Sequence, residues 1–94
     1  MLKKYSNPKW HAFIEQFNNF KDLHEVEAFF DTILTATEKV EFANRLCIIK
    51  ELLLNKETQR DIAKNLKVSL ANVTRGSNVL KTSKYDLKKL LKID

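Results

Sequence analysis

The chain has 94 residues but only one glycine and one proline, and this scarcity limits its fold more than any other feature. Tight β-turns, hairpins and glycine-rich phosphate loops need positive-φ residues at several places, and one glycine cannot supply them repeatedly. We therefore predict an all-α fold. The length corresponds to a single domain over residues 1–94.

The chain has too few cysteines and histidines to stabilise its fold with a disulfide or a bound metal. The one cysteine, Cys47, allows no internal disulfide, and no Cys/His cluster has zinc-ligand spacing, so we expect no metal. A reducing cytoplasm suits such a chain. No apolar run approaches the roughly 20 residues needed to span a bilayer, and residues 1–6 lack the apolar region of a signal peptide. These features predict a soluble, cytoplasmic protein with no membrane partner.

Charge is distributed unevenly along the chain. Residues 1–44 carry 5 lysines and 7 acidic residues, whereas residues 45–94 carry 12 basic and 5 acidic residues, a net of +7. A basic half of this strength is typical of proteins that bind a phosphate backbone. An ordinary solvated, lysine-rich surface is the alternative.

Capping residues divide the chain into six predicted helices. Each start has an N-cap residue, in several cases followed by proline or by an acid three residues on. The predicted N-caps are Asn7, Asp22, Thr35 or Thr37, Thr58, Ser69 and Ser83. Apolar residues at helical spacing then predict buried faces on the first two helices. These residues are Trp10, Phe13, Ile14, Phe17 and Phe20, then Val26, Phe29, Phe30 and Ile33.

The third predicted helix is apolar nearly all round between Arg45 and Asn55. Such a helix must be buried on nearly every side, and a small monomer has little material to surround it. Homodimerisation solves this problem, although a central helix in a monomeric bundle remains the alternative. We expect residues 1–57 to form mainly a dimerisation core, residues 58–81 a helix-turn-helix, and residues 82–94 a C-terminal helix.

Residues 59–81 have the pattern of two short helices joined by a tight turn, which is typical of the helix-turn-helix. The residues expected to face inward are Ile62, Ala63, Leu66, Val68, Val73 and Leu80. Lys67 stands where such turns usually have glycine, so the turn needs another backbone route or a strained lysine. An ordinary helical hairpin that does not bind DNA is the alternative.

Residues predicted to be exposed on this segment could reach DNA. Gln59 and Arg60 lie at the start of the first helix, where they could contact phosphate or a base edge. Leu70, Ala71 and Thr74 lie on the outward side of the second helix, where a recognition helix enters the major groove. Their small or apolar groups could contact thymine methyls or leave room for bridging water.

The only glycine, Gly76, lies inside the second helix of this pair, where it costs about 1 kcal/mol relative to alanine. A missing β-carbon allows a flat group to lie against the helix beside the guanidinium of Arg75. Close packing against another helix explains the glycine equally well.

Residues 34–81, LTATEKVEFANRLCIIKELLLNKETQRDIAKNLKVSLANVTRGSNVLK, resemble the tryptophan repressors of bacterial tryptophan operons. The most specific string is TRGSN-x-LK, from Thr74 to Lys81. The likeness is strong over about half of the chain, and the helix order extends it over the whole. Length and richness in lysine and asparagine resemble the short chlamydial form.

The resemblance implies a six-helix, intertwined homodimer that takes L-tryptophan as corepressor and then binds a palindromic operator. Arg75 would pair with the tryptophan carboxylate, and Arg45 would stack on the indole. Gly76 would give the ligand clearance. Val79 replaces a serine near the ligand's amino end and removes a polar contact.

Each tryptophan pocket would be shared between subunits, according to the same resemblance. The hydroxyl of Thr35 and the backbone carbonyls of Thr32 and Leu34 would come from one subunit, and the arginines from the other. The implied DNA-binding residues are Gln59, Arg60, Ala63, Lys67, Ser69, Leu70, Ala71, Thr74 and Lys81. Ala63 replaces a lysine of the family, and Lys67 and Ser69 replace glycines, so operator contacts do not transfer directly.

Three other functions are alternatives to this one. An enzyme would need a nucleophile and base, but Cys47 lies in the apolar stretch, and His11 and His24 are on other predicted helices. A ligand-independent DNA-binding module, similar to the C-terminal domain of bacterial replication initiators, would not need the set Thr35, Arg45, Arg75 and Gly76. A pure protein-interaction dimer would leave the basic half as solvated surface.

Overall fold

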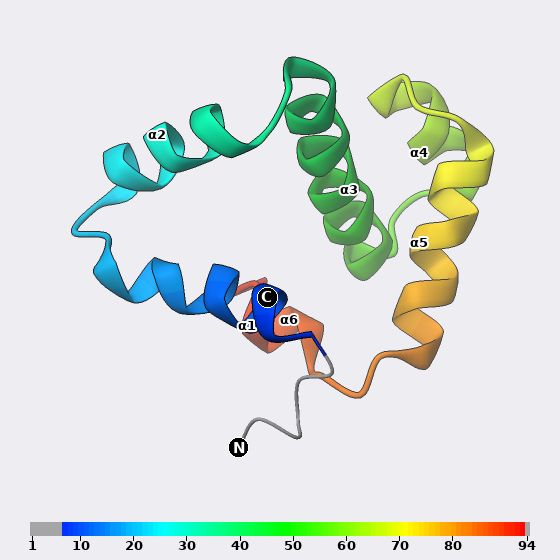
Figure 1. The fold of residues 1–94 in the computed structure, drawn as a ribbon. Helices are drawn as coiled ribbons and strands as arrows, with labels where there is room; N and C mark the ends of the chain where they lie inside the picture. Colours follow the sequence, from blue (N-terminus) through cyan, green and yellow to red (C-terminus); the bar gives the residue numbers. More distant parts are fainter. Residues whose placement is uncertain (1–6, 94) are drawn as a thin grey trace. The chain divides into compact units, whose positions relative to one another are not determined.

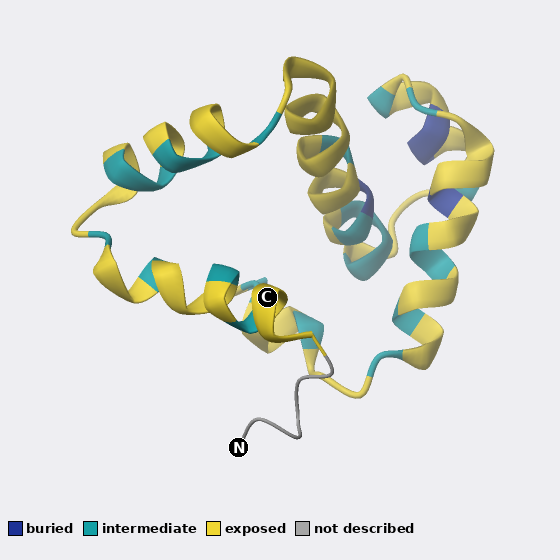
Figure 2. Ribbon diagram, viewed as in Figure 1, coloured by how far each residue is buried: buried dark blue, intermediate teal, exposed yellow. Residues whose placement is uncertain are grey.

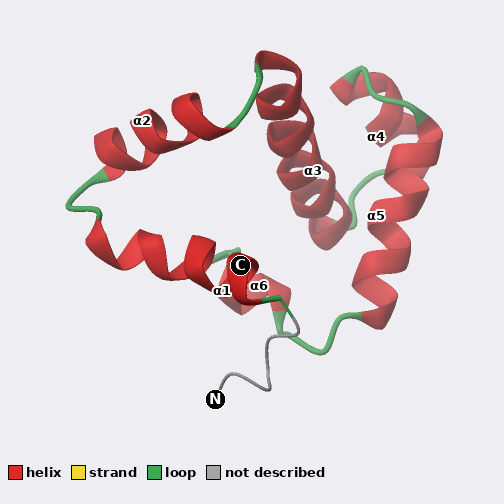
Figure 3. Cartoon of the chain, viewed as in Figure 1, coloured by secondary structure: helices red, strands yellow, loops and turns green. Residues whose placement is uncertain are grey.

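The computed structural model describes residues 7–93, and within them every regular element is a helix (Figures 1 and 3). The elements are α1 (Pro8–Glu15), the 3₁₀ helix η2 (Gln16–Asn19), α2 (Leu23–Ile33), α3 (Ala36–Leu54), α4 (Gln59–Leu66), α5 (Leu70–Thr82) and α6 (Leu87–Leu90). The predicted all-α fold is confirmed. The chain forms two compact units, Met1–Thr35 and Ala36–Asp94, which are described separately below.

The first unit is built from capped helices that share an aromatic cluster. The Asn7 side chain caps α1 by accepting from the backbone N–H of Lys9 at 3.0 Å. Asp22 caps α2 by accepting from the N–H of Glu25 at 3.0 Å, and the Glu25 carboxylate accepts in return from the N–H of Lys21. Both predicted starts are confirmed, although the return bond reaches one residue before the cap.

Aromatic rings hold the helices of this unit together. The rings of Phe13 and Phe29 lie 5.4 Å apart between centroids, and those of Phe17 and Phe29 lie 5.5 Å apart. Phe20 also contacts Phe29, at 5.1 Å. The phenylalanines predicted on the two faces therefore meet. Trp10, Ile14 and Ile33, which were predicted to be buried with them, are 53%, 44% and 51% exposed, so the prediction of two buried faces is confirmed only for the phenylalanines.

The second unit packs α3, α4 and α5 around a small core (Figure 2). Its buried residues are Ile48, Ile62, Ala63 and Val73, with Leu52, Leu66 and Val68 packed against them. Ile62 and Val73 are fully buried. The interior predicted for residues 59–81 is thus confirmed in its main members, and Leu80 is half-buried.

The turn between α4 and α5 is made without glycine. Lys67 adopts the left-handed conformation, with φ 58° and ψ 46°. Its N–H donates to the carbonyl of Lys64, and the N–H of Val68 donates to that of Ala63. This pair of bonds is the Schellman motif, which usually has glycine at the position of Lys67. Of the two predicted solutions, the turn therefore uses a lysine in a strained backbone conformation. Val68, the next residue, packs against the core.

The N-caps predicted for α4 and α5 are confirmed, whereas the one predicted for the last helix is wrong. Thr58 and Ser69 each accept from the N–H three residues on, both at 3.1 Å. Ser83 instead ends α5, and its hydroxyl accepts from the N–H of Tyr85. Asp86 caps α6, accepting from the N–H of Lys89 at 3.1 Å, because a longer link follows α5 than the pattern suggested.

Helix α3 buries only one of its faces within this chain. Ile48 is buried against α4 and α5, but Phe42 and Leu46 on another face are exposed. The prediction of burial nearly all round is therefore not met by one chain alone. No helix within residues 7–93 is both long and apolar enough to cross a membrane.

Candidate functional site

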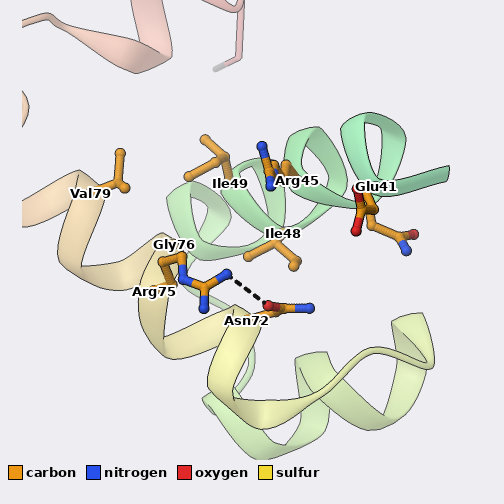
Figure 4. Close-up of a pocket in the computed structure, with 9 residues that line it drawn as sticks. Glu41, Arg45, Ile48, Ile49, Asn72, Arg75, Gly76 and Val79 are labelled. Atoms are coloured by element: carbon orange, nitrogen blue, oxygen red, sulfur yellow. Dashed lines mark hydrogen bonds between the residues drawn. The ribbon is translucent and has the colours of Figure 1, made fainter. Parts of the chain in front are cut away.

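A cavity of about 280 Å³ opens between α3 and α5 in the second unit (Figure 4). This volume is near the lower end of the range of about 300–1,000 Å³ for small-molecule sites. The cavity is lined by Glu41, Asn44, Arg45, Ile48, Ile49, Asn72, Arg75, Gly76 and Val79. Four residues predicted from the sequence, Arg45, Arg75, Gly76 and Val79, are therefore brought together.

The cavity combines an apolar floor with the positive charges of two arginines and the carboxylate of Glu41. Ile48, Ile49 and Val79 supply the apolar part, and Arg45 and Arg75 supply the guanidinium groups from opposite helices (Figure 4). A guanidinium stays protonated at any physiological pH and binds carboxylates with paired N–H donors. Such a site suits a flat, mainly apolar ligand that carries an anionic group.

Each arginine has a neighbour that limits its movement. The Nη1 group of Arg75 donates to Oδ1 of Asn72 at 3.2 Å. The guanidinium carbon of Arg45 lies 6.0 Å from the ring centroid of Phe42, at the outer limit of a cation–π contact. Both contacts join residues three apart on one helix, so α5 and α3 each orient their own arginine.

At Gly76, α5 lies close against side chains of α3. A β-carbon at this position would lie 2.8 Å from Cγ2 of Ile48 and 3.3 Å from Cδ1 of Leu52. The glycine is needed for helix packing, which was one of the two explanations offered by the sequence. Because Gly76 also lines the cavity, the second explanation, clearance for a ligand, stays a prediction.

Five lining residues were not predicted: Glu41, Asn44, Ile48, Ile49 and Asn72. Helical spacing could have identified them, since positions 41, 45 and 49 share one face of α3, and positions 72, 76 and 79 share one face of α5. The missing step was to extend the periodicity from each predicted arginine along its helix.

The three other residues implied for tryptophan binding lie at the end of the first unit. Thr32 is in the last turn of α2, and its hydroxyl donates to the carbonyl of Ala28 at 3.0 Å. Leu34 is the C-cap residue of α2, with an extended backbone. Thr35 directly precedes α3. Their part in a shared pocket stays a prediction.

The residues implied for DNA binding lie on α4, on α5 and in the turn between them. Arg60, Lys67, Ser69, Leu70, Ala71, Thr74 and Lys81 are exposed, and Gln59 is half-buried. Ala63 is different, because only 8% of its surface is accessible and it packs in the core under α5. Its side chain therefore offers little accessible surface to DNA, and its inclusion among the DNA-contacting residues stays a prediction.

A hydrogen bond links the two helices at this surface. The hydroxyl of Thr74 on α5 donates to Oε1 of Gln59, the first residue of α4, at 3.0 Å. This bond fixes the start of α4 against α5. Within residues 7–93, no group of His, Cys, Asp and Glu side chains could hold a metal ion.

This chain is similar to known proteins of one family. The family described as "Trp repressor protein" matches residues 8–93. A "Trp operon repressor homolog" of Chlamydia caviae is 36% identical over 92 residues, covering 98% of this chain and 91% of the relative. A relative of the same description from Haemophilus influenzae is 33% identical, covering 89% of this chain and 83% of its own length. Another, from Chlamydia trachomatis, is 34% identical and covers 96% of this chain and 96% of its own length. The chain belongs to the Trp repressor family.

Proposed function

We propose that this protein is a bacterial transcriptional repressor that binds a palindromic operator of tryptophan metabolism genes when L-tryptophan occupies the cavity between α3 and α5. Family membership supports the general part of this proposal, because Trp repressors are DNA-binding transcription regulators and not enzymes. The corepressor, the operator and the dimer are the specific parts, each with its own support and test.

One observation carries the corepressor assignment. Arg45 and Arg75 line a single cavity with an apolar floor, although they are 30 positions apart in sequence. Tryptophan has an apolar indole and an α-carboxylate, which match that floor and those charges. We assign Arg75 to the carboxylate and Arg45 to one face of the indole.

The rest of the pocket would come from a second subunit. We propose that Thr35 contributes its hydroxyl, and Thr32 and Leu34 their backbone carbonyls, to tryptophan bound at the other subunit's arginines. The hydroxyl of Thr32 already donates to Ala28, which is consistent with a role for its carbonyl alone. The extended backbone at Leu34 keeps its carbonyl out of the helical bonding pattern.

Homodimerisation is supported by the apolar residues that one chain leaves exposed. Phe42 and Leu46, one turn apart on α3, are 48% and 44% exposed, and Val40 on the same helix is 59% exposed. In the first unit, Trp10 on α1 is 53% exposed. Apolar residues that lie together on an exposed helix face, such as Phe42 and Leu46, mark an interaction surface. We propose that both units belong to one domain, in which residues 1–57 of two chains form the dimer core.

DNA binding is assigned to α4, the Lys67 turn and α5, acting as a helix-turn-helix. The N-terminal residues of α5, Leu70, Ala71 and Thr74, would enter the major groove, with Arg60, Lys67 and Lys81 positioned for phosphates. Dimeric helix-turn-helix repressors, Trp repressors among them, read half-sites about 34–36 Å apart. Tryptophan can promote binding only if it favours the matching placement of α5 over others.

The decisive experiment titrates duplex DNA carrying a tryptophan-operon palindrome with the full chain, with and without L-tryptophan, at fixed salt. We expect tryptophan to tighten binding at least tenfold. Equal affinity in both conditions would contradict the corepressor role and favour a ligand-independent DNA-binding module. No preference for the palindrome over a scrambled duplex would contradict operator recognition.

Two variants separate the proposed sites. Arg75→Ala should abolish calorimetric tryptophan binding, whereas Arg60→Ala should leave it unchanged and weaken operator binding in saturating tryptophan. Lys50→Ala is the matched control, because Lys50 is exposed on α3 and lines no part of the cavity. Loss of tryptophan binding in Arg60→Ala would show that the assignment of α4 to DNA is wrong.

A further inference from the structure

The side chain of Asn72 contacts the charged group of Arg75 inside the cavity. Its Oδ1 accepts from Nη1 of Arg75 at 3.2 Å, and both residues line the cavity (Figure 4). They are three residues apart and therefore lie on the same side of α5, one turn from each other. Asn72 thus limits the directions in which the guanidinium can point.

The chemistry of this contact leaves the arginine's charge intact. An amide oxygen is an uncharged acceptor, and a guanidinium has five N–H donors, of which this bond uses one. Within residues 7–93 no carboxylate forms an ion pair with Arg75. The group is therefore held in place while its full charge and its other donors stay available to an anion.

Asn72 is also tied to the beginning of α5. Its backbone N–H donates to Oγ of Ser69, the N-cap residue, at 3.1 Å. Asn72 therefore occupies the third position of the helix, where its backbone is fixed by the cap. The side chain that holds Arg75 starts from one of the best-anchored positions of α5.

We propose that Asn72 is a positioning residue of the ligand site, which orients Arg75 through an uncharged acceptor and so makes the site selective for an anionic ligand. This inference rests on the proposed function, since it concerns the same cavity. It adds Asn72 to the residues predicted from the sequence to bind tryptophan. It also explains why this residue is an asparagine, because an aspartate there would hold the guanidinium but cancel much of its charge.

Two substitutions test the acceptor and its charge separately. Asn72→Ala removes the acceptor, so Arg75 becomes free to rotate. Asn72→Asp keeps the acceptor's shape and adds a negative charge. Both variants retain the backbone bond to Ser69, and an acid in the first turn of a helix is favourable, so both should fold. Circular dichroism and thermal melting confirm this before binding is measured.

The binding experiment uses two indoles that differ in charge. Indole-3-propionate has a carboxylate and no ammonium, whereas tryptamine has an ammonium and no carboxylate. We expect calorimetry to give about 3- to 10-fold weaker indole-3-propionate binding for Asn72→Ala. For Asn72→Asp we expect a larger loss for indole-3-propionate together with a gain for tryptamine, which a purely structural defect would not produce.

Asn78→Ala is the control, because Asn78 is an exposed asparagine of the same helix that does not line the cavity. It should bind both indoles like the wild type. Wild-type affinity in both Asn72 variants, or an equal change for both indoles in Asn72→Asp, would overturn the role of Asn72 alone. Wild-type protein that binds neither L-tryptophan nor indole-3-propionate would instead contradict the proposed function itself.

Discussion

A β-carbon at position 76 would lie 2.8 Å from Cγ2 of Ile48, closer than β-carbons approach other non-bonded heavy atoms in proteins. Gly76→Ala therefore combines two opposing effects. Alanine raises helix propensity by about 1 kcal/mol, but overpacking a core contact costs about 1–3 kcal/mol. Because Ile48 is only 3% exposed and has little room to move, we expect a net loss of about 1 kcal/mol in urea unfolding.

The same relationship provides its own control. Ile48→Ala removes the atom that the new methyl would meet, at a large cost in stability of its own. In that background Gly76→Ala should become stabilising, by about 1 kcal/mol. Equal effects of Gly76→Ala in both backgrounds would show that the glycine is not required by this contact.

Local signals predicted most of the fold because they depend on neighbouring residues. Asn7, Asp22, Thr58 and Ser69 each cap the helix they were expected to cap, since a cap needs only the next two or three backbone N–H groups. The prediction that Ser83 caps the last helix was wrong because a hydroxyl can satisfy a nearby backbone N–H in a turn as well as at a helix start. Its hydroxyl accepts from the N–H two residues on, which satisfies a turn rather than a helix.

Long-range packing decided what the local signals left open. The sequence could not say whether Gly76 serves packing or a ligand, because that depends on how closely α3 approaches α5. The residue pattern predicted that Ala63 faces inward, whereas the resemblance placed it among the DNA contacts, and the packing of α4 against α5 shows that its side chain is buried. Family resemblance named Arg45 and Arg75, but not Asn72; helical spacing places Asn72 on the same side of α5 as Arg75, and the structure adds the hydrogen bond between them.

Val79 offers a direct way to alter ligand affinity. Its side chain lines the cavity and is 50% exposed, so a hydroxyl there would not be buried. Val79→Thr should therefore change stability by less than about 0.5 kcal/mol and tighten L-tryptophan binding about fivefold, by giving the ligand's ammonium an acceptor. Val79→Ala is the control for lost apolar contact. Calorimetry that finds no difference between the two variants would place the ammonium elsewhere.

The exposed face of α3 allows the proposed dimer to be tested. Phe42 and Leu46 are four residues apart and lie on a face different from that of buried Ile48. Leu46→Glu should place a charge in the apolar interface and weaken the dimer. We expect sedimentation equilibrium to show a dimer dissociation constant at least tenfold higher than that of the wild type. Lys64→Glu introduces the same carboxylate at an exposed position of α4, outside the proposed dimer core, and should stay dimeric. A Leu46→Glu protein that folds and remains fully dimeric would show that this face of α3 is not part of the dimer interface.

Lys67 connects backbone strain with DNA binding, and three variants separate them. Its left-handed conformation, with φ 58°, costs a side chain about 1–2 kcal/mol that glycine avoids. Lys67→Gly should therefore raise the free energy of unfolding by about 1 kcal/mol, after the greater flexibility of the unfolded chain is subtracted. Asn55→Gly, at φ 53°, should gain less, because asparagine tolerates this conformation.

The charge of Lys67 gives the second readout. If its ammonium contacts a phosphate, Lys67→Gly should lower the slope of log affinity against log salt by about one. Lys67→Ala should lower the slope equally without the gain in stability, since it removes the charge but keeps a β-carbon in the strained backbone. An unchanged salt slope in both variants would show that Lys67 is not part of the proposed DNA surface. A gain in stability for Lys67→Ala would show that glycine does not stabilise this turn by relieving backbone strain.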